Sequence, residues 1–249
     1  SARVSRLLDV IQFPSTQRTL DTGTLQVQSQ TGTTDILSAI RECEISENAQ
    51  FFIGKDGKAV FRNRNYRLSN TKAVNVQATF SNDGSNLPYV DVVNTFDTHE
   101  VRNVYQWTRK SGNTQFVSDA NSVARYRPIA SVKQTINVSD SDVLSLIDQK
   151  IAETSLPIVR IDSLKVNPRQ DVNIWEKALG LEFGDRISVK IVNPDTSSYT
   201  DELWIESIQH NVNASTQTWA WNITLSPASS SGWVLGQAKL GVGTRFAYT

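Results

Sequence analysis

The fold is decided by residues 202–211, ELWIESIQHN, together with residues 217–225, QTWAWNITL. Apolar and polar residues alternate along most of both runs, and this alternation is the period of a half-buried β-strand. Trp219 and Trp221 are two positions apart, so their side chains share one face of the second strand. The two runs therefore predict two successive β-strands.

Similar runs recur from Ala73 onward, with Gly, Asn, Asp and Pro clusters between them. Short alternating runs separated by turn residues are typical of an antiparallel barrel or sandwich. Two helices interrupt it, at residues 139–151 after the cap at Ser139 and at residues 171–180, which end in a glycine. We expect these helices to cover the open ends of a barrel. The other expected strands are residues 74–80, 89–95, 103–108, 129–138, 158–166 and 186–192.

The N-terminal part of the sequence has a different pattern of apolar and polar residues. Apolar residues at helical spacing predict helices over residues 4–11 and 35–43. The runs at residues 50–53 and 59–62 flank the pair Asp56-Gly57, which readily supplies a positive backbone φ and so predicts a hairpin. These elements predict a small α+β unit of two helices and a hairpin.

The sequence thus predicts an α+β fold that is mainly antiparallel β. The expected domains are residues 1–72 as the helix-helix-hairpin domain and residues 73–227 as a barrel-rich domain with two covering helices. Residues 228–249 are expected to be a Ser-rich linker and a docking tail. The tail has too little sequence to form a core, so its apolar residues are candidates for contacts with a partner. These candidates are Trp233, Leu235, Leu240, Phe246 and Tyr248.

Composition excludes several classes of function. Lys plus Arg and Asp plus Glu number 25 each, so the formal net charge is zero and no global field draws the chain to nucleic acid or anionic lipid. No run of about 18 apolar residues is present, so no integral membrane segment is expected. The chain begins with Ser1 and has no Met, which favours a segment of a longer protein.

No motif for cofactor, metal or nucleophilic chemistry is present. His99 and His210 form neither an HExxH nor an HxH pair, and Cys43 sits among apolar residues at helical spacing, as expected for a buried small side chain. The acid pairs Asp140 with Asp142, Asp201 with Glu202, and Asp97 with Glu100 fit helix caps and solvated turns better than a glycosidase site. We therefore expect no enzyme activity, no cofactor and no metal.

Two other features carry a binding hypothesis. Arg62, Arg64 and Arg67 follow the hairpin and suit either a phosphate-contacting stripe or, as we favour, a strand edge protected by charge. Three tryptophans, if exposed in a groove, would stack on sugar rings. A core or a subunit interface explains them more simply, so a carbohydrate-binding module that recognises the host cell surface is the alternative function. These tryptophans are Trp107, Trp219 and Trp221.

Several motifs follow one another in a particular order along the chain. The early ones are RVSRLL at residues 3–8, DILSAI at 35–40 and FFIGKDGKAVF at 51–61. The later ones are LEFGDRISV at 181–189, WIESI at 204–208, WAWNITLSP at 219–227, and WVLG at 233–236 followed by LGV at 240–242. This order and spacing resemble the minor tail proteins of long-tailed phages of actinobacteria. The resemblance covers most of the chain except roughly residues 82–138.

The resemblance implies a tail-tip hub related to the baseplate hubs of contractile phages, in which three subunits form a ring that continues the tail tube. It implies a non-enzymatic structural protein that is a homotrimer, located in the virion at the tail tip and assembled in the cytoplasm of the bacterial host. Implied partners are other tail proteins, namely distal tail, tape measure, and tip or fibre subunits, with host attachment as a further role. The chain departs from such hubs in lacking their N-terminal barrel, which again favours a fragment. It also shows no appended peptidase or glycosidase domain, which argues against contact with the cell wall.

Overall fold

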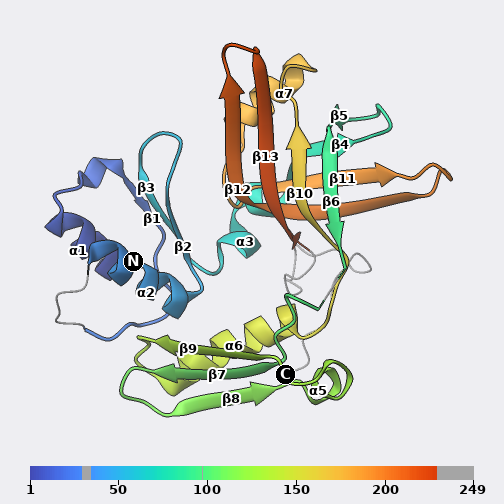
Figure 1. Ribbon diagram of the computed structural model, residues 1–249. Coiled ribbons are helices and arrows are strands. Elements are labelled where there is room, and N and C mark those ends of the chain that lie inside the picture. The colour runs from blue at the N-terminus through green and yellow to red at the C-terminus, as the bar shows by residue number, and fades with distance from the viewer. Residues whose placement is uncertain (30–34, 97, 229–249) are drawn as a thin grey trace. The chain divides into compact units, whose positions relative to one another are not determined.

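The computed structural model describes residues 1–29, 35–96 and 98–228 (Figure 1). The chain divides into two compact units, each built from two separate stretches of sequence. The first unit is Ser1–Tyr66 with Thr98–Pro157, and the second is Arg67–Asp97 with Ile158–Thr249. This division differs from the expected domains 1–72 and 73–227, because residues 98–157 pack with the N-terminal part of the chain.

The N-terminal part of the first unit contains the predicted helices and hairpin. Helix α1 is Ala2–Val10 and α2 is Ile36–Glu47, and the strands β1 (Arg18–Leu20), β3 (Ala59–Arg62) and β2 (Gln50–Ile53) form a sheet in that order. A short 3-10 helix at Ser15–Gln17 precedes β1. The predicted hairpin is confirmed: β2 and β3 are antiparallel, and Gly57 has the positive φ of 77° that its turn requires. The core here contains Val4, Leu8, Ile40, Cys43, Ala59, Phe61 and Ile136.

The second stretch of this unit forms its own small sheet. Strands β7 (Val104–Arg109), β8 (Thr114–Ser118) and β9 (Ala130–Thr135) pair in the order β8-β7-β9, with α5 (Ala120–Tyr126) between β8 and β9. Helix α6 (Asp140–Thr154) packs on one face of this sheet, and the Ser139 hydroxyl accepts a hydrogen bond from the Asp142 N–H at 3.1 Å, as the cap prediction requires. The core between helix and sheet contains Tyr105, Trp107, Val143, Leu146 and Ile147.

Polar contacts attach this stretch to the N-terminal part. The Ile136 N–H donates to the Ser46 hydroxyl at 2.9 Å, and the Asn137 amide donates to the Ser46 carbonyl at 2.8 Å. All three residues are buried. Because unpaired polar groups are costly to bury, these bonds fix residues 98–157 to the first unit.

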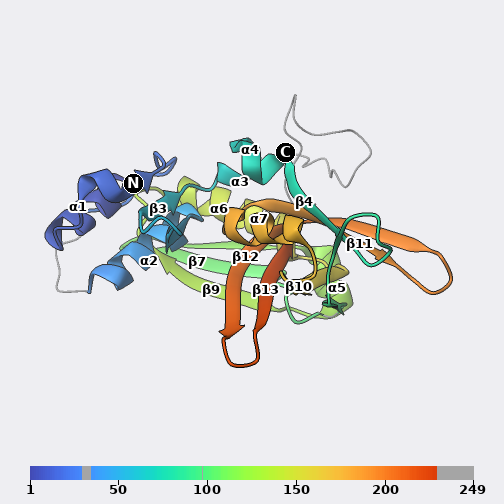
Figure 2. The ribbon, with the colours of Figure 1, turned by 90° about the horizontal axis from the view of Figure 1, so that it is seen from above.

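The second unit is built around a seven-stranded sheet of order β5-β4-β11-β12-β13-β10-β6. Its bounds are β4 Val76–Ser81, β5 Leu87–Pro88, β6 Asp91–Thr95, β10 Arg160–Val166, β11 Arg186–Val192, β12 Ser198–Asn213 and β13 Thr218–Pro227. Short helices α3 (Tyr66–Ser69) and α4 (Thr71–Val74) precede β4. Helix α7 (Val172–Gly180) lies over the part of the sheet formed by β10, β12 and β13 (Figure 2).

The long strand β12 belongs to two parts of this sheet. Its first half pairs with β11 and its second half with β13, and the pairing with β13 shifts register between Ile205 and Ser207. Such a bulge bends a strand and increases its twist. Figure 1 shows the result, because the β11–β12 hairpin runs in a different direction from the β12–β13 hairpin. The core of the unit lies inside this bend and contains Phe80, Ile187, Leu203, Ile205, Trp221 and Ile223 among others.

The α+β class is confirmed, with sheets rich in antiparallel pairs. The expected closed barrel is not present in the described residues, because β5 and β6 each have a partner strand on one side only. The bent sheet follows the curvature of a barrel without closing. Within the described ranges, no helix has the length and apolar character that a membrane span requires.

Candidate interaction surfaces

Side chains that could hold a metal ion are scattered. Within the described ranges, no group of three or more His, Cys, Asp or Glu residues is arranged to bind one. Cys43 is buried, as predicted, and burial raises the pKa of its thiol. A thiol held in its neutral form is a weak nucleophile and a weak metal ligand.

The acid pairs are engaged in structural contacts. Asp140 accepts from the Arg109 guanidinium at 2.5 Å at the start of α6. Asp201 and Glu202 are consecutive on β12, so they point to opposite faces of the sheet, and Glu202 pairs with Arg186. Asp97 lies outside the described residues. Asp140 and Asp142 lie in the first turn of α6, near the cap expected there, whereas Asp201 and Glu202 lie within a strand and not in the solvated turn that the sequence predicted.

Asp201 and Tyr199 form a partly buried polar pair on β12. The Tyr199 hydroxyl donates to Asp201 at 3.0 Å. Burial raises the pKa of Asp201, and burial together with the nearby Asp201 carboxylate raises the pKa of Tyr199 to about 12. Both groups are thus held toward their neutral forms in the folded chain.

The three arginines after the hairpin have different partners. Arg62 is buried with its guanidinium 4.0 Å from the centre of the Tyr66 ring, and Arg64 donates to the Ser145 hydroxyl at 3.3 Å. Arg67 donates to Glu206 at 2.6 Å and lies over the ring of Trp204. The three side chains therefore make separate contacts with different residues, and they do not line up as a phosphate-contacting stripe.

Two of the three predicted sugar-stacking tryptophans are in cores. Trp221 is 0% exposed and meets Phe80 edge to face, and Trp107 is 3% exposed with its indole N–H donating to the Ser131 hydroxyl at 3.2 Å. Neither residue offers a ring face to a ligand. Trp219 is partly exposed, so the stacking hypothesis applies to it alone among the three.

Trp219 belongs to an exposed apolar surface that we call the aromatic ledge, made of Val172, Trp175, Leu179, Val212 and Trp219. Trp175 is 44% exposed and meets Trp219 edge to face, with ring centroids 4.7 Å apart. Val172, Trp175 and Leu179 are spaced by three and four residues, so they share one side of α7. Val212 lies opposite Trp219 across β12 and β13 and is 70% exposed.

Helix α7 has more apolar residues than its core contact uses. Of Ile174, Trp175, Ala178 and Leu179, only Ile174 and Ala178 are buried. The helix is apolar over a wider arc than its own core contact covers. Val172 at the start of the helix was the signal in the sequence that its apolar surface extends beyond the core.

His210 borders the ledge and is held by both tryptophans of β13. The Trp219 indole N–H donates to His210 Nδ1 at 3.1 Å, and the imidazole stacks on Trp221 with an angle of 9° between the ring planes. Burial lowers the pKa of His210. The neutral imidazole therefore acts as a hydrogen-bond acceptor that fixes the orientation of Trp219.

A second exposed surface is the outer face of the β8-β7-β9 sheet in the first unit. Phe116, Gln106 and Val132 form a row across the three strands, because Gln106 is in register with both of the others. Phe116 is 59% and Val132 is 71% exposed. Helix α6 packs against Tyr105 and Trp107, whose side chains alternate with that of Gln106 along β7 and so lie on the opposite face.

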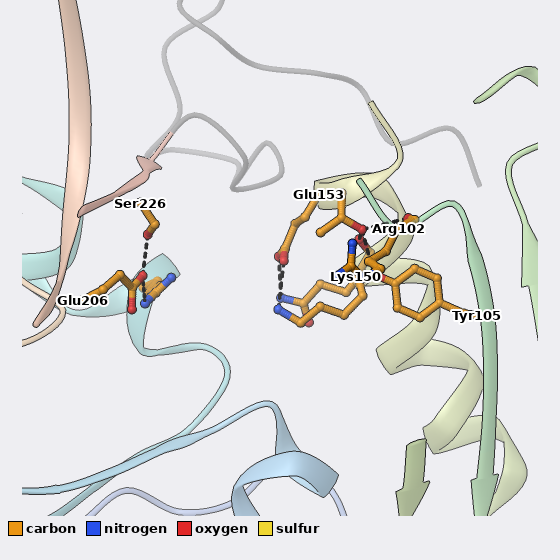
Figure 3. A network of polar contacts seen from close by, with 9 residues as sticks. Arg102, Tyr105, Lys150, Glu153, Glu206 and Ser226 are labelled. Carbon is orange, nitrogen blue, oxygen red and sulfur yellow. Dashed lines mark hydrogen bonds and ion pairs between the residues drawn. The ribbon is translucent and has the colours of Figure 1, made fainter. Parts of the chain in front are cut away.

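Two polar networks close to the ends of elements are drawn in Figure 3. In the second unit, Glu206 accepts from both Arg67 and the Ser226 hydroxyl, which ties the end of β13 to α3. In the first unit, the hydroxyls of Thr154 and Tyr105 share a hydrogen bond of 2.6 Å, and the Thr154 hydroxyl donates to the Arg102 carbonyl at 3.0 Å. The Lys150–Glu153 ion pair lies next to them. Each network stabilises its own unit.

The predicted partner contacts Trp233, Leu235, Leu240, Phe246 and Tyr248 lie outside the described residues. Their role as contacts stays a prediction.

Comparisons with known proteins find similarity at the level of the fold. No protein-family model matches the sequence, and no curated protein matches it. A tail protein from Neisseria meningitidis MC58 matches 90% of this chain with a TM-score of 0.59 and 10% identity. The prophage tail protein gp18 from Listeria monocytogenes EGD-e matches 88% with a TM-score of 0.47 and 10% identity. The chain spans 65% and 64% of the lengths of these two proteins, and it shares the fold of the Neisseria tail protein.

Proposed function

We propose that this chain is a structural, non-enzymatic subunit of a bacteriophage tail. The observation that carries the proposal is the match of 90% of the chain to the fold of the Neisseria tail protein. The placement of Asp140 at the start of α6, of Cys43 in a core and of His210 against Trp219 and Trp221 agrees with a structural role. Because one fold can host different functions, the exposed surfaces of this chain must supply the rest of the argument.

Within the tail, we assign the chain to the hub at the tail tip, where it forms a symmetric homotrimeric ring and docks neighbouring tail proteins. The sequence motifs that resemble minor tail proteins support this assignment. The exposed apolar surfaces support it as well, since contiguous apolar side chains on a folded protein mark sites of association. The aromatic ledge is such a surface, and Phe116 and Val132 are two exposed apolar side chains on either side of Gln106. The tail residues after Pro227 are proposed as a further contact.

The decisive experiment is the mass of the chain in solution, measured by light scattering over a wide range of concentration. We expect a trimer or larger ring, and we expect deletion of all residues after Pro227 to weaken it. A matched control replaces Ser198, an exposed polar residue at the start of β12 that lies outside both surfaces, with Ala. A chain that stays monomeric in every form and at every concentration contradicts ring formation.

The second candidate function is recognition of host surface carbohydrate by the aromatic ledge. The favouring observation is the partly exposed Trp175–Trp219 pair beside the polar side chain of His210, because sugar sites combine aromatic faces with a few polar groups. Titration with cell-wall polysaccharide should then change the tryptophan fluorescence. Trp175→Ala should abolish the change, and Glu176→Ala, at an exposed position of the same helix outside the ledge, should preserve it. A response that survives Trp175→Ala excludes the ledge as the site.

A further inference from the structure

The second unit has a stretch of strand edge without a partner. On one side, β4 pairs with β11 along Val76 to Ser81, and on the other side it meets β5 only at Phe80 and Ser81. In the part of the chain that the structure describes, residues 76–79 therefore have no strand partner on the side away from β11. Such an edge presents main-chain N–H and C=O groups that an added strand can pair with.

The free edge lies in a groove of about 490 Å³. It is lined by β4 and residues 85–87, and also by Asp171, Asn173 and Lys177, which belong to α7 and its N-terminal cap. Gln77 and Thr79 of β4 are partly exposed there, while Ala78 is buried. The lining thus mixes apolar and polar groups, which suits a strand whose side chains alternate in character.

The end of the sequence offers a segment of this kind. Residues 244–249, TRFAYT, contain no Gly or Pro and consist largely of β-branched and aromatic residues, which favour strands. Phe246 and Tyr248 would share one face with Thr244, and Arg245 would lie on the other face. The segment is 6 residues long, which is enough to cover the free stretch 76–79.

The register of the sheet gives the distance between the end of β13, after which the C-terminal residues follow, and β4. Pro227 is in register with Leu203, Leu203 with Ile187, and Ile187 with Ala78. The end of β13 is therefore about 14 Å from β4, three strand spacings inside the same sheet. From Ala228 to residue 244 the chain can extend about 50 Å, which is enough to leave its own sheet altogether.

The shortest path from the end of β13 to the β4 edge of the same chain crosses β12 and β11, and packed side chains cover both faces of the sheet there. On one face, Leu203 and Ile205 are 0% exposed in the core. On the other face, Trp204 lies under α3 and α4, with its indole N–H donating to the Ala73 carbonyl at 2.9 Å and the Arg67 guanidinium 4.7 Å from its ring. A segment of the same chain would have to pass around this packing, whereas the edge is open to a neighbour.

We propose that the free edge of β4 in one copy receives residues 244–249 of a second copy as an added strand. The inference rests on the proposed ring function and names the contact that closes the ring. Each copy has one such edge and one such segment, so the contact is head to tail and repeats around a symmetry axis until the ring closes.

The test is disulfide trapping between two single variants, Gln77→Cys and Ala247→Cys, mixed under oxidising conditions. A bond between them can form only between two copies, and the native Cys43 is buried. We expect the covalent dimer to form at least about tenfold faster than from the control mixture of Val93→Cys with Ala247→Cys, because docking raises the local concentration of the two thiols. Val93 is an exposed residue of β6, the opposite edge strand of the same sheet.

Equal rates in the two mixtures overturn the proposal. A second result also overturns the proposal. In it, the double variant Gln77→Cys with Ala247→Cys forms an internal disulfide at high dilution, while the mixture of single variants gives no dimer. The segment then docks on its own chain. Light scattering of the unmodified chain separates the two hypotheses. If the ring is present but trapping fails, only the strand contact is refuted, and if the chain is monomeric throughout, the ring is refuted as well.

Discussion

Asn103 is the buried polar residue on which the connection from α5 to β9 depends. Its amide nitrogen donates to the Ser122 hydroxyl at 3.0 Å and to the Arg127 carbonyl at 2.8 Å, and its amide oxygen accepts from the Ile129 N–H at 2.7 Å. Asn103 is 0% exposed, so water does not replace these partners. Arg127 has a positive φ of 65°, a conformation that a non-glycine residue adopts at a cost.

Replacing Asn103 with Ala removes all three bonds and leaves the Ile129 N–H and the Arg127 carbonyl without the side chain that satisfies them. At about 1 kcal/mol for each net hydrogen bond, with a further penalty for unsatisfied groups, the loss is about 3 kcal/mol or more. That is a large part of the roughly 5–15 kcal/mol by which a typical domain is stable. We expect the loss to appear in residues 98–157.

The assay is urea unfolding with hydrogen-exchange mass spectrometry, which reports residues 98–157 separately from the second unit. The control is Gln106→Ala, which also truncates an amide side chain near β7 but at an exposed position, and it should change the free energy of unfolding by less than about 0.5 kcal/mol. A loss below about 1 kcal/mol for Asn103→Ala, or equal losses for both variants, would refute the reasoning.

Three further predictions concern the second unit. Trp221→Ala in the core should lower the free energy of unfolding by about 3–5 kcal/mol, and Trp175→Ala on the ledge by far less, as urea denaturation would measure. The pKa of Tyr199 is raised from 10.0 to about 12, so its contribution to stability should be present below pH 10 and be lost as the pH rises toward 12. Tyr199→Phe should remove that loss in denaturation curves across this range, and an unchanged curve contradicts it. The lowered pKa of His210 means that its contribution is present above its ordinary pKa of 6.5 and is lost as the pH falls through the folded value. Protonation also removes the acceptor of Trp219, so acid titration should shift its fluorescence, and a shift that persists in His210→Phe argues against this origin.

Local patterns in the sequence predicted most of the elements. The strands expected at residues 186–192, 202–211 and 217–225 correspond to β11, β12 and β13, and the hairpin around Gly57 is present. These elements could be found because alternation, caps and turn residues act within a few positions of one another. Strand β8 was missed, since it is a run of only 5 residues, TQFVS, whose two apolar residues Phe116 and Val117 are adjacent and do not alternate with polar ones.

The division into units could not be predicted in the same way. It depends on Ser46 bonding to Ile136, a contact between residues 90 positions apart that leaves no local signal in either segment. The open sheet was missed for a similar reason, because closure depends on whether β5 meets β6 and not on the pattern within any strand. The burial of Trp107 and Trp221 likewise follows from which sheet face is covered, whereas the sequence shows only that Trp219 and Trp221 share a face.

The discontinuous second unit has a consequence for the order of events during synthesis. Asn82, just after β4, bonds the main chain of Val192 at the end of β11, and the two residues are 110 positions apart. At a translation rate of about 5–20 residues per second, β4 leaves the ribosome roughly 5–20 seconds before β11 does. Residues 98–157 emerge within that interval, and Ser1–Tyr66, the rest of the first unit, emerge before β4. The first unit can therefore fold while the ribosome is still translating the second, and β4 must wait with both of its edges open until its partner appears.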